Sequence, residues 1–202
     1  MNVNEVKIEG ENDIEKCLNI FNNEIKKFNE KKYASNVEES HRLNKLSLKE
    51  KIKSNIDSVW KEFLILICKD LNSKLKVEQL EKNAFYHTDL GIVFRLTEYD
   101  IEKKIISIEW FANEQWFTRL IRLKSKGKDK TKIIYTDVVK GIVAISGFLQ
   151  RRVLNTYNKK QINAFKIQMI DLKFSLDLID KTKLTKTRLE KENLIDRNKK
   201  IY

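Results

Sequence analysis

Apolar residues recur every three or four positions near both ends of this chain and every second position in its middle. The first helical pattern runs from about Asn12 to Lys32, and its apolar residues form one stripe. Such a stripe must be buried against another element. The pattern therefore predicts an amphipathic helix that packs on the rest of the protein.

Alternation with a period of two begins at Lys45 and continues to Lys53, as in a half-buried strand. Glu50 falls on the apolar face of this segment, so we expect it at a sheet edge or beside a cation. A helical pattern follows, with Ser54 and Asp57 as candidate N-caps and an end near Asn72. The segment predicts a strand that leads directly into a helix.

The middle of the chain alternates in a series of aromatic-rich segments. They predict strands at Phe85–Thr88, Gly91–Tyr99, Ile105–Ala112, Gln115–Lys124 and Lys132–Val139. Asn113 and Glu114 offer a tight turn between two of them. These segments predict an antiparallel sheet.

A long helical pattern returns after Gly141 and continues to Ile179, and the chain contains no proline to interrupt it. A second apolar row on this helix comprises Ile167, Ile170, Phe174 and Leu178. We expect the N-terminal helix to cover that row through Phe21, Ile25 and Phe28. A partner in a homodimer is the alternative.

This order of elements predicts an α+β fold, in which a curved antiparallel sheet is gripped by a long C-terminal helix and an extra amphipathic helix precedes it. We divide the chain into an N-terminal helical appendage and linker (residues 1–40), a helix-grip domain (41–180) and a basic tail (181–202).

Several segments carry a family resemblance. The helix start SNIDSVWKEF, the strands GIVFRLTEYD, KKIISIEWFA and KTKIIYTDVV, and the helix from Gly141 to Ile179 resemble the START-like (SRPBCC, helix-grip) superfamily. The closest resemblance is to an uncharacterised family of mollicutes and related low-GC bacteria. The resemblance covers about Leu43 to Ile179, and it implies a cavity for an apolar ligand, such as a lipid, between sheet and helix.

Composition and charge narrow the class of protein. The net charge of +12 is spread broadly, with a concentration in the tail, which favours weak, nonspecific attraction to polyanions or acidic membrane surfaces over specific nucleic-acid binding. Neither a secretory signal nor a transmembrane stretch is recognisable, so we expect a cytoplasmic protein. Cys17 and Cys68 form no close motif and are interpreted as buried free thiols.

The chain offers few signs of catalysis. His41 and His87 are far apart in sequence and lack other ligands at metal-binding spacing, so we predict neither a metal nor a cofactor. The resemblance implies that some enzymes of the superfamily act through scattered carboxylates or tyrosines in the cavity. Glu98, Glu109, Tyr135 and Asp137 could serve in that way, but we interpret each as strand surface. The sequence favours a non-enzymatic protein.

Aromatic residues on successive strands give the positive hint. Filling of the core is the simplest role for any single ring, and a ligand pocket beneath the long helix is the alternative. The candidates for lining such a cavity are Phe94, Trp110, Trp116, Tyr135, Leu149 and Phe165. Arg119 and Arg122 could anchor the anionic head of a ligand.

Two functions therefore compete. A module that binds a hydrophobic or amphipathic small molecule requires an apolar cavity of roughly 300 Å³ or more. An interaction protein that docks a macromolecule or an acidic surface requires a filled core and an exposed patch. The basic residues proposed for that patch, besides the tail, are Arg151, Arg152, Lys159 and Lys160.

Overall fold

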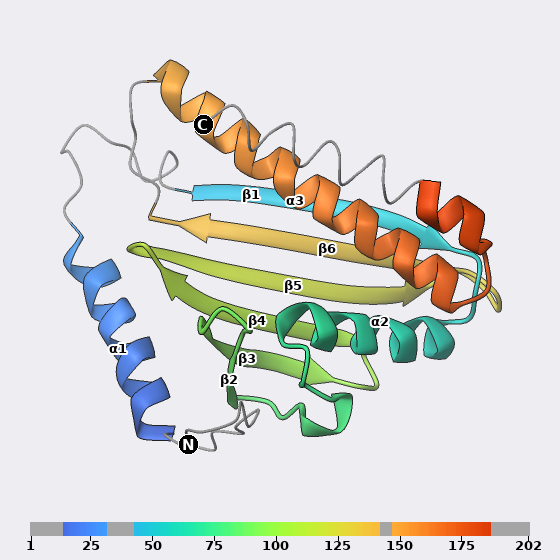
Figure 1. Ribbon diagram of the computed structural model, residues 1–202, viewed down its shortest axis with the longest axis horizontal. Helices are drawn as coiled ribbons and strands as arrows, with labels where there is room; N and C mark the ends of the chain where they lie inside the picture. Colours follow the sequence, from blue (N-terminus) through green and yellow to red (C-terminus); the bar gives the residue numbers. More distant parts are fainter. Residues whose placement is uncertain (1–13, 32–42, 142–146, 187–202) are drawn as a thin grey trace.

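A six-stranded antiparallel sheet forms the centre of the computed structural model, which describes residues 14–31, 43–141 and 147–186 (Figure 1). The strand order β1-β6-β5-β4-β3-β2 places the first strand beside the last. The strands are β1 (Leu43–Ile52), β2 (Phe85–His87), β3 (Val93–Asp100), β4 (Ile105–Ala112), β5 (Gln115–Ser125) and β6 (Thr131–Lys140). The helices are α1 (Ile14–Glu30), α2 (Ile56–Leu71) and α3 (Gly147–Ser175), with a 3₁₀ turn, η2, at Val77–Gln79. The predicted α+β class is confirmed.

Both α2 and α3 cover the same face of the sheet, which we call the inner face (Figure 1). Because side chains alternate along each strand, every second residue of the strands reaches this layer. The largest buried cluster of the protein lies here, and its members from the sheet include Phe94, Leu96, Ile106, Ile108, Ile121 and Tyr135. Helices α2 and α3 contribute Phe63, Ile67, Phe165, Met169 and Leu172. The packing of α3 on this face is the arrangement of sheet and long helix that the sequence predicts.

Local signals set the ends of α2 and of the β4–β5 hairpin. Asn55 caps α2, since its side chain accepts a hydrogen bond from the backbone N–H of Ser58 at 2.9 Å. The predicted caps Ser54 and Asp57 were wrong, because Asp57 already lies in the first turn. Asn113 and Glu114 both have positive φ, 52° and 56°, which confirms the tight turn.

Polar contacts attach α3 to the edge strand β1. Lys173 donates to Glu50 at 2.5 Å, so Glu50 has both the edge position and the cation that the sequence suggested. Asn44 donates to the side chain of Asn158 at 2.9 Å. The described helix ends at Ser175, before the predicted Ile179, and Asp177 then adopts a positive φ of 55°. Residues 142–146 lie outside the described part.

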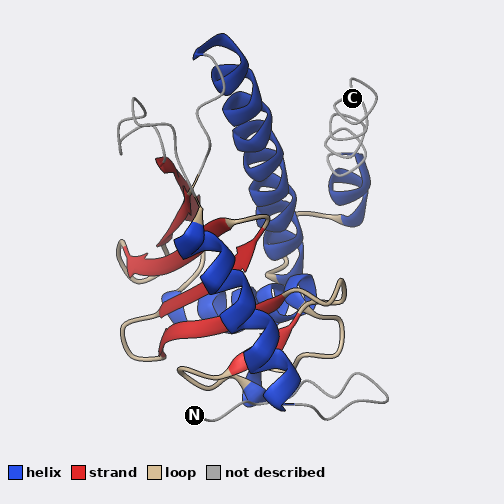
Figure 2. Ribbon diagram, turned by 90° about the vertical axis from the view of Figure 1, so that its left-hand side faces the viewer, coloured by secondary structure: helices blue, strands red, loops and turns tan. Residues whose placement is uncertain are grey.

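The N-terminal helix does not lie where the sequence placed it. Cys17 and Phe21 of α1 are buried against Phe85 and Val93, with Phe111 packed beside them. These sheet residues alternate with inner-face residues, so α1 covers the opposite, outer face. Figure 2 shows α1 in front of the strands, while α3 rises to one side of them. The expected packing of α1 on the second apolar row of α3 was therefore wrong.

Edge-to-face contacts between aromatic rings explain why α1 packs on the outer face. The ring of Phe21 meets those of Phe85 and Phe111 edge to face, with centroids 5.0 and 5.3 Å apart, a favourable geometry for aromatic pairs. Phe28 packs similarly on Phe111, at 5.7 Å. In the row expected to receive α1, Phe174 is 39 % exposed. A homodimer partner on that row remains a prediction.

Replacing Phe21 with alanine tests this packing. Because the side chain is 4 % exposed, Phe21→Ala should lower the free energy of unfolding by about 3 kcal/mol, measured by urea denaturation. The matched control is Ile20→Ala on the solvent side of the same helix, where the side chain is 39 % exposed, with an expected loss below about 1 kcal/mol. Equal losses in the two variants would contradict the placement of α1.

Candidate functional site

A charged residue, Arg119, reaches into the apolar layer between the sheet and the helices. It lies opposite Ile108 on β4 and Asp137 on β6, and residues paired across a sheet share one face. Arg119 therefore points inward with Ile108 and Asp137. Arg122, three residues further along β5, pairs with Ile105 and Ile134 and lies on the outer face. Of the two arginines considered as ligand anchors, only Arg119 faces the interior.

Hydrogen bonds hold Arg119 in place. Its Nε donates to Asp137 Oδ1 at 3.2 Å, and one terminal nitrogen donates to Gln161 of α3, also at 3.2 Å. Tyr157 of α3 donates its hydroxyl hydrogen to the other oxygen of Asp137 at 3.1 Å. Asp137 is 2 % exposed, whereas the side chain of Arg119 is 25 % exposed. These bonds satisfy two of the five N–H donors of Arg119.

The surrounding rings reinforce the charge of Arg119. Its guanidinium carbon lies 5.1 Å from the ring centre of Tyr135 and 5.4 Å from that of Trp110, within cation–π range. Burial alone would lower the pKa of Arg119, but Tyr135 and Asp137 outweigh that effect and raise it. Burial also raises the pKa of Tyr135 and Tyr157 above the usual tyrosine value, and Asp137 adds to the effect at both. The cluster thus carries one cation, one anion and two neutral phenols at physiological pH.

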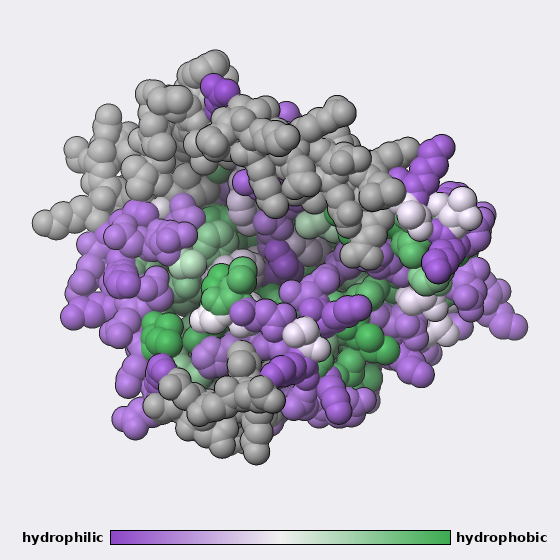
Figure 3. Space-filling view, in the orientation of Figure 1, coloured by the Kyte–Doolittle hydropathy of each residue, from purple (hydrophilic) through white to green (hydrophobic). Residues whose placement is uncertain are grey.

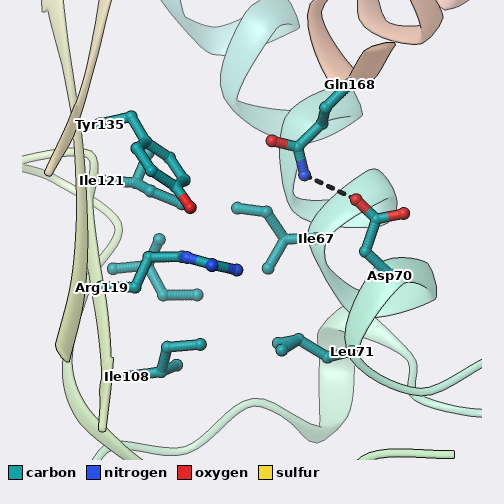
Figure 4. A pocket seen from close by; sticks show the side chains of 9 residues that line it. Ile67, Asp70, Leu71, Ile108, Arg119, Ile121, Tyr135 and Gln168 are labelled. Carbon is teal, nitrogen blue, oxygen red and sulfur yellow. Dashed lines mark hydrogen bonds between the residues drawn. The ribbon is translucent and has the colours of Figure 1, made fainter. Parts of the chain in front are cut away.

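A pocket opens beside Arg119, between the sheet and α2. Figure 4 shows the side chain of Arg119 extending from the sheet into this space below Tyr135, with Asp70 and Gln168 on the helix side. Gln168 donates to Asp70 at 2.7 Å, while burial and the charge of Asp171 raise the pKa of Asp70. The other lining residues are Ile67, Leu71, Ile106, Ile108, Ile121 and Tyr135. The wall is therefore apolar, with one cation at its base and one carboxylate opposite.

The pocket is smaller than the ligand-binding hypothesis requires, and the filled layer around it is what the interaction-protein alternative predicts. Its volume is about 50 Å³, room for a few water molecules, against the roughly 300 Å³ expected of a ligand cavity. Large rings occupy the remaining space: Phe165 packs on Tyr135 at 5.3 Å, and Phe94 stacks on Tyr86 at 5.4 Å. In Figure 3, hydrophobic side chains show in several groups across the middle of the molecule, with hydrophilic side chains among and beside them.

The six cavity candidates separate into three groups. Phe94, Trp110, Tyr135 and Phe165 all belong to the inner layer, although only Tyr135 lines the pocket. Trp116 pairs with Phe111 on the outer face and packs on Phe28 of α1, so its predicted inward placement was wrong. The physical reason is the two-residue turn at Asn113, which aligns Trp116 with Phe111 and Phe117 with Trp110. The side chain of Leu149 lies outside the described part.

Two carboxylates interpreted as strand surface are in fact buried. Asp137 is 2 % and Glu109 7 % exposed. Glu109 lies on the outer face, where it pairs with Arg95 and accepts a hydrogen bond from the indole N–H of Trp116 at 3.2 Å. The sheet therefore separates Glu109 from the pocket. Asp137, in contrast, accepts the hydrogen bond from Arg119 on the inner face. The predicted surface positions of these two residues were wrong.

Other expected sites are placed as follows. Arg152, Lys159 and Lys160 lie exposed on α3, and the side chain of Arg151 is outside the described part.

Cys17 Sγ contacts His87 Nε2; His41 belongs to the residues that are not described. Within residues 14–31, 43–141 and 147–186, no three His, Cys, Asp or Glu side chains are grouped to hold a metal ion. None of the helices described is long and apolar enough to cross a membrane.

Sequence reasoning missed Asp70, Gln161 and Gln168. Each belongs to a helix and is polar, so a single sequence gives no reason to place it inside. A partial signal exists in Asp137, a carboxylate on the same strand face as Tyr135 and Val139. A charged side chain on an apolar face requires a partner, and Arg119 is the direct cross-strand neighbour of Asp137.

Comparisons with known proteins address the fold. No protein-family model matches this chain, and no curated protein matches it. Among solved structures, CalU16 from Micromonospora echinospora is 10 % identical, covering 77 % of this chain and 88 % of its own, with a TM-score of 0.47. A conserved protein of unknown function from Enterococcus faecalis is 15 % identical over 85 % and 98 %, with a TM-score of 0.46. Norcoclaurine synthase from Thalictrum flavum, in complex with dopamine and hydroxybenzaldehyde, is 12 % identical over 75 % and 99 %, with a TM-score of 0.45.

The helix-grip arrangement of this chain, a curved antiparallel sheet crossed by a long C-terminal helix, is shown by its own strand order and helices. At such identities the likeness concerns the fold, and no activity follows from it. The closer relation to a family of mollicutes and low-GC bacteria stays a prediction.

The Arg119–Asp137 pair makes a stability prediction. Arg119→Met should lower the free energy of unfolding by about 3 kcal/mol, because it leaves the buried Asp137 carboxylate without its cation. The double variant R119M/D137N should recover much of this loss, since neither buried charge then remains. Urea denaturation of the two single variants and the double variant measures the coupling; strictly additive losses would contradict a direct pair.

The buried phenols make a pH prediction. Because the pKa of Tyr157 is raised by burial and by Asp137, its contribution to stability is present below pH 10 and is lost as the pH rises above that value. In an ultraviolet titration at 295 nm, Tyr157→Phe should remove one phenol that ionises later than ordinary tyrosines. Loss of an early-ionising phenol in this variant would be the wrong result.

Proposed function

We propose that this protein binds a small amphipathic molecule that carries an anionic group, with no chemical transformation of the ligand. The apolar part lies against Ile67, Leu71 and Ile108, and the anionic group bonds to Arg119. The observation that supports the proposal most strongly is the position of Arg119: a permanent cation is held inside an apolar pocket (Figure 4), and it retains N–H donors beyond those bonded to Asp137 and Gln161.

The arrangement of bonds supports this role for Arg119. Asp137 engages Nε, the nitrogen nearest the backbone, and Gln161 accepts one hydrogen bond from a terminal nitrogen, so further N–H groups of the terminal nitrogens remain for a ligand. A guanidinium fork matches the planar geometry of a carboxylate. A purely structural ion pair could be enclosed completely with Asp137. A quarter of the Arg119 side chain nevertheless remains exposed.

The size of the pocket limits the ligand. A volume of about 50 Å³ admits a small group, and a molecule with a ring or a chain requires α2 and α3 to move apart. Gln168 and Asp70 form a side-chain hydrogen bond between these helices at the pocket, 2.7 Å long and exposed to solvent. Exposed hydrogen bonds cost little to break, so this contact is a suitable place for opening.

Benzoate and benzamide are matched probes, since they share a ring and differ in charge. Titrated into ¹⁵N-labelled protein, benzoate should shift the amide signals of Ile67, Ile108 and Tyr135, and benzamide should bind about tenfold more weakly, because a bond to a charged acceptor is stronger by about 1.4 kcal/mol. The charge-free variant R119M/D137N should bind both probes equally. Equal binding to the wild type, or shifts elsewhere on the surface, would contradict the proposal.

A filling substitution tests the site without touching its charge. Leu71 lines the pocket from α2 and is half-buried, so Leu71→Phe should occupy the space and abolish the shifts caused by benzoate. The control is Ile65→Phe on the exposed side of the same helix, where the side chain is 45 % exposed; it should bind benzoate like the wild type. Unchanged binding by the Leu71 variant would place the ligand elsewhere.

The alternative function, docking of a macromolecule or acidic surface by the exposed Arg152, Lys159 and Lys160 of α3 and by the basic tail, predicts a different result. Such a protein would bind its partner through charges on the solvent side of α3. Substitutions at Arg119 and Leu71 would then leave partner binding unchanged.

A further inference from the structure

Seven lysines gather at one end of the sheet, away from the pocket. They lie on β1, at the end of β5, in the β5–β6 hairpin and at the start of β6: Lys49, Lys51, Lys124, Lys126, Lys128, Lys130 and Lys132. All are exposed except the half-buried Lys132. We call this surface the lysine patch.

Three of these lysines stand in a row across the sheet. Lys51 lies directly opposite Lys132, and Lys132 lies directly opposite Lys124. Directly opposed like charges destabilise a sheet. Burial, together with the charges of Lys49, Lys126, Lys51 and Lys124, lowers the pKa of Lys132, which reports the same repulsion. Among the residues that the structure describes, no carboxylate forms a salt bridge with any member of the patch.

Protection of the sheet edge explains only part of the patch. Lysines on an edge strand discourage pairing with other chains, and Lys49 and Lys51 lie on the edge strand β1. Lys124 and Lys132, however, lie on β5 and β6, which have neighbours on both sides. Their charges add repulsion without protecting an edge.

We propose that the lysine patch docks the protein on an acidic phospholipid bilayer. Each lysine close to a bilayer rich in anionic lipids gains on the order of 1 kcal/mol, and several act together. The anionic surface supplies the counter-charges that the fold omits around Lys51, Lys124 and Lys132. The patch lies at the hairpin end of the sheet, so docking leaves the Arg119 pocket uncovered.

The layout of the charges favours a bilayer over a nucleic acid. The lysines spread over three neighbouring strands and a hairpin, hence over an area, as suits a plane of headgroups. Proteins that bind single strands place aromatic rings beside their cations. The outer-face positions around the patch carry none, since the nearest aromatic residue on that face of β5, Trp116, packs on Phe28 at the far end of the strand.

Co-sedimentation of the full chain with vesicles tests the docking. Wild-type protein should bind vesicles of phosphatidylcholine with 30 % phosphatidylglycerol in about 0.1 M NaCl, and it should not bind phosphatidylcholine alone. The variant K51Q/K124Q/K132Q should lower the partition coefficient by about fivefold for each lysine, about a hundredfold in total. Its melting temperature should be equal or higher, because the substitutions remove repulsion.

A matched control separates the patch from overall charge. The variant K69Q/K82Q/K166Q removes three exposed lysines from α2, α3 and the loop before β2, with the same change in net charge and the tail intact in both variants. It should lose no more than a few-fold in partition. Equal losses in the two variants, or no binding by the wild type, would overturn the proposal. Tighter binding to a 20-base-pair DNA duplex than to the acidic vesicles, lost in the patch variant, would likewise overturn it in favour of a nucleic acid.

Discussion

The alternation of side chains across one six-stranded sheet determines the whole architecture. A sheet with apolar residues on both faces needs cover on both, and this chain supplies α2 and α3 for the inner face and α1 for the outer face. The helices thereby confine the pocket to one layer and keep it separate from the aromatic cluster around Phe21. At the hairpin end of β5 and β6 the lysines of the patch lie exposed, except for the half-buried Lys132.

Arg119 brings chemistry into this architecture. Burial of a cation costs free energy unless it is paired, and the fold meets that cost with Asp137, Gln161 and two aromatic rings. These partners use two of the five N–H donors of the guanidinium, and others remain at the pocket. In the proposed function, the part of Arg119 that stays accessible binds the ligand.

Sequence patterns predict the strands, the helices and the turn, but they do not predict which of two opposite faces of the sheet a helix or a side chain occupies. Strand bounds, the Asn113–Glu114 turn, Glu50 at an edge with a cation, and a helix across the sheet all follow from local patterns. The position of α1 does not follow from a local pattern, because its apolar stripe fits any apolar surface. Trp116 was misplaced because period two gives two equivalent faces and only register chooses between them. Polar helix residues such as Gln161 reach the site through tertiary packing alone.

Native mass spectrometry of protein purified from its own host tests the central claim, that the charge inside the pocket exists for an anionic guest. The account predicts a mass above that of the bare chain, released on denaturation as a small organic anion and absent from the charge-free R119M/D137N protein. A bare chain, or the same added mass on both proteins, would contradict it.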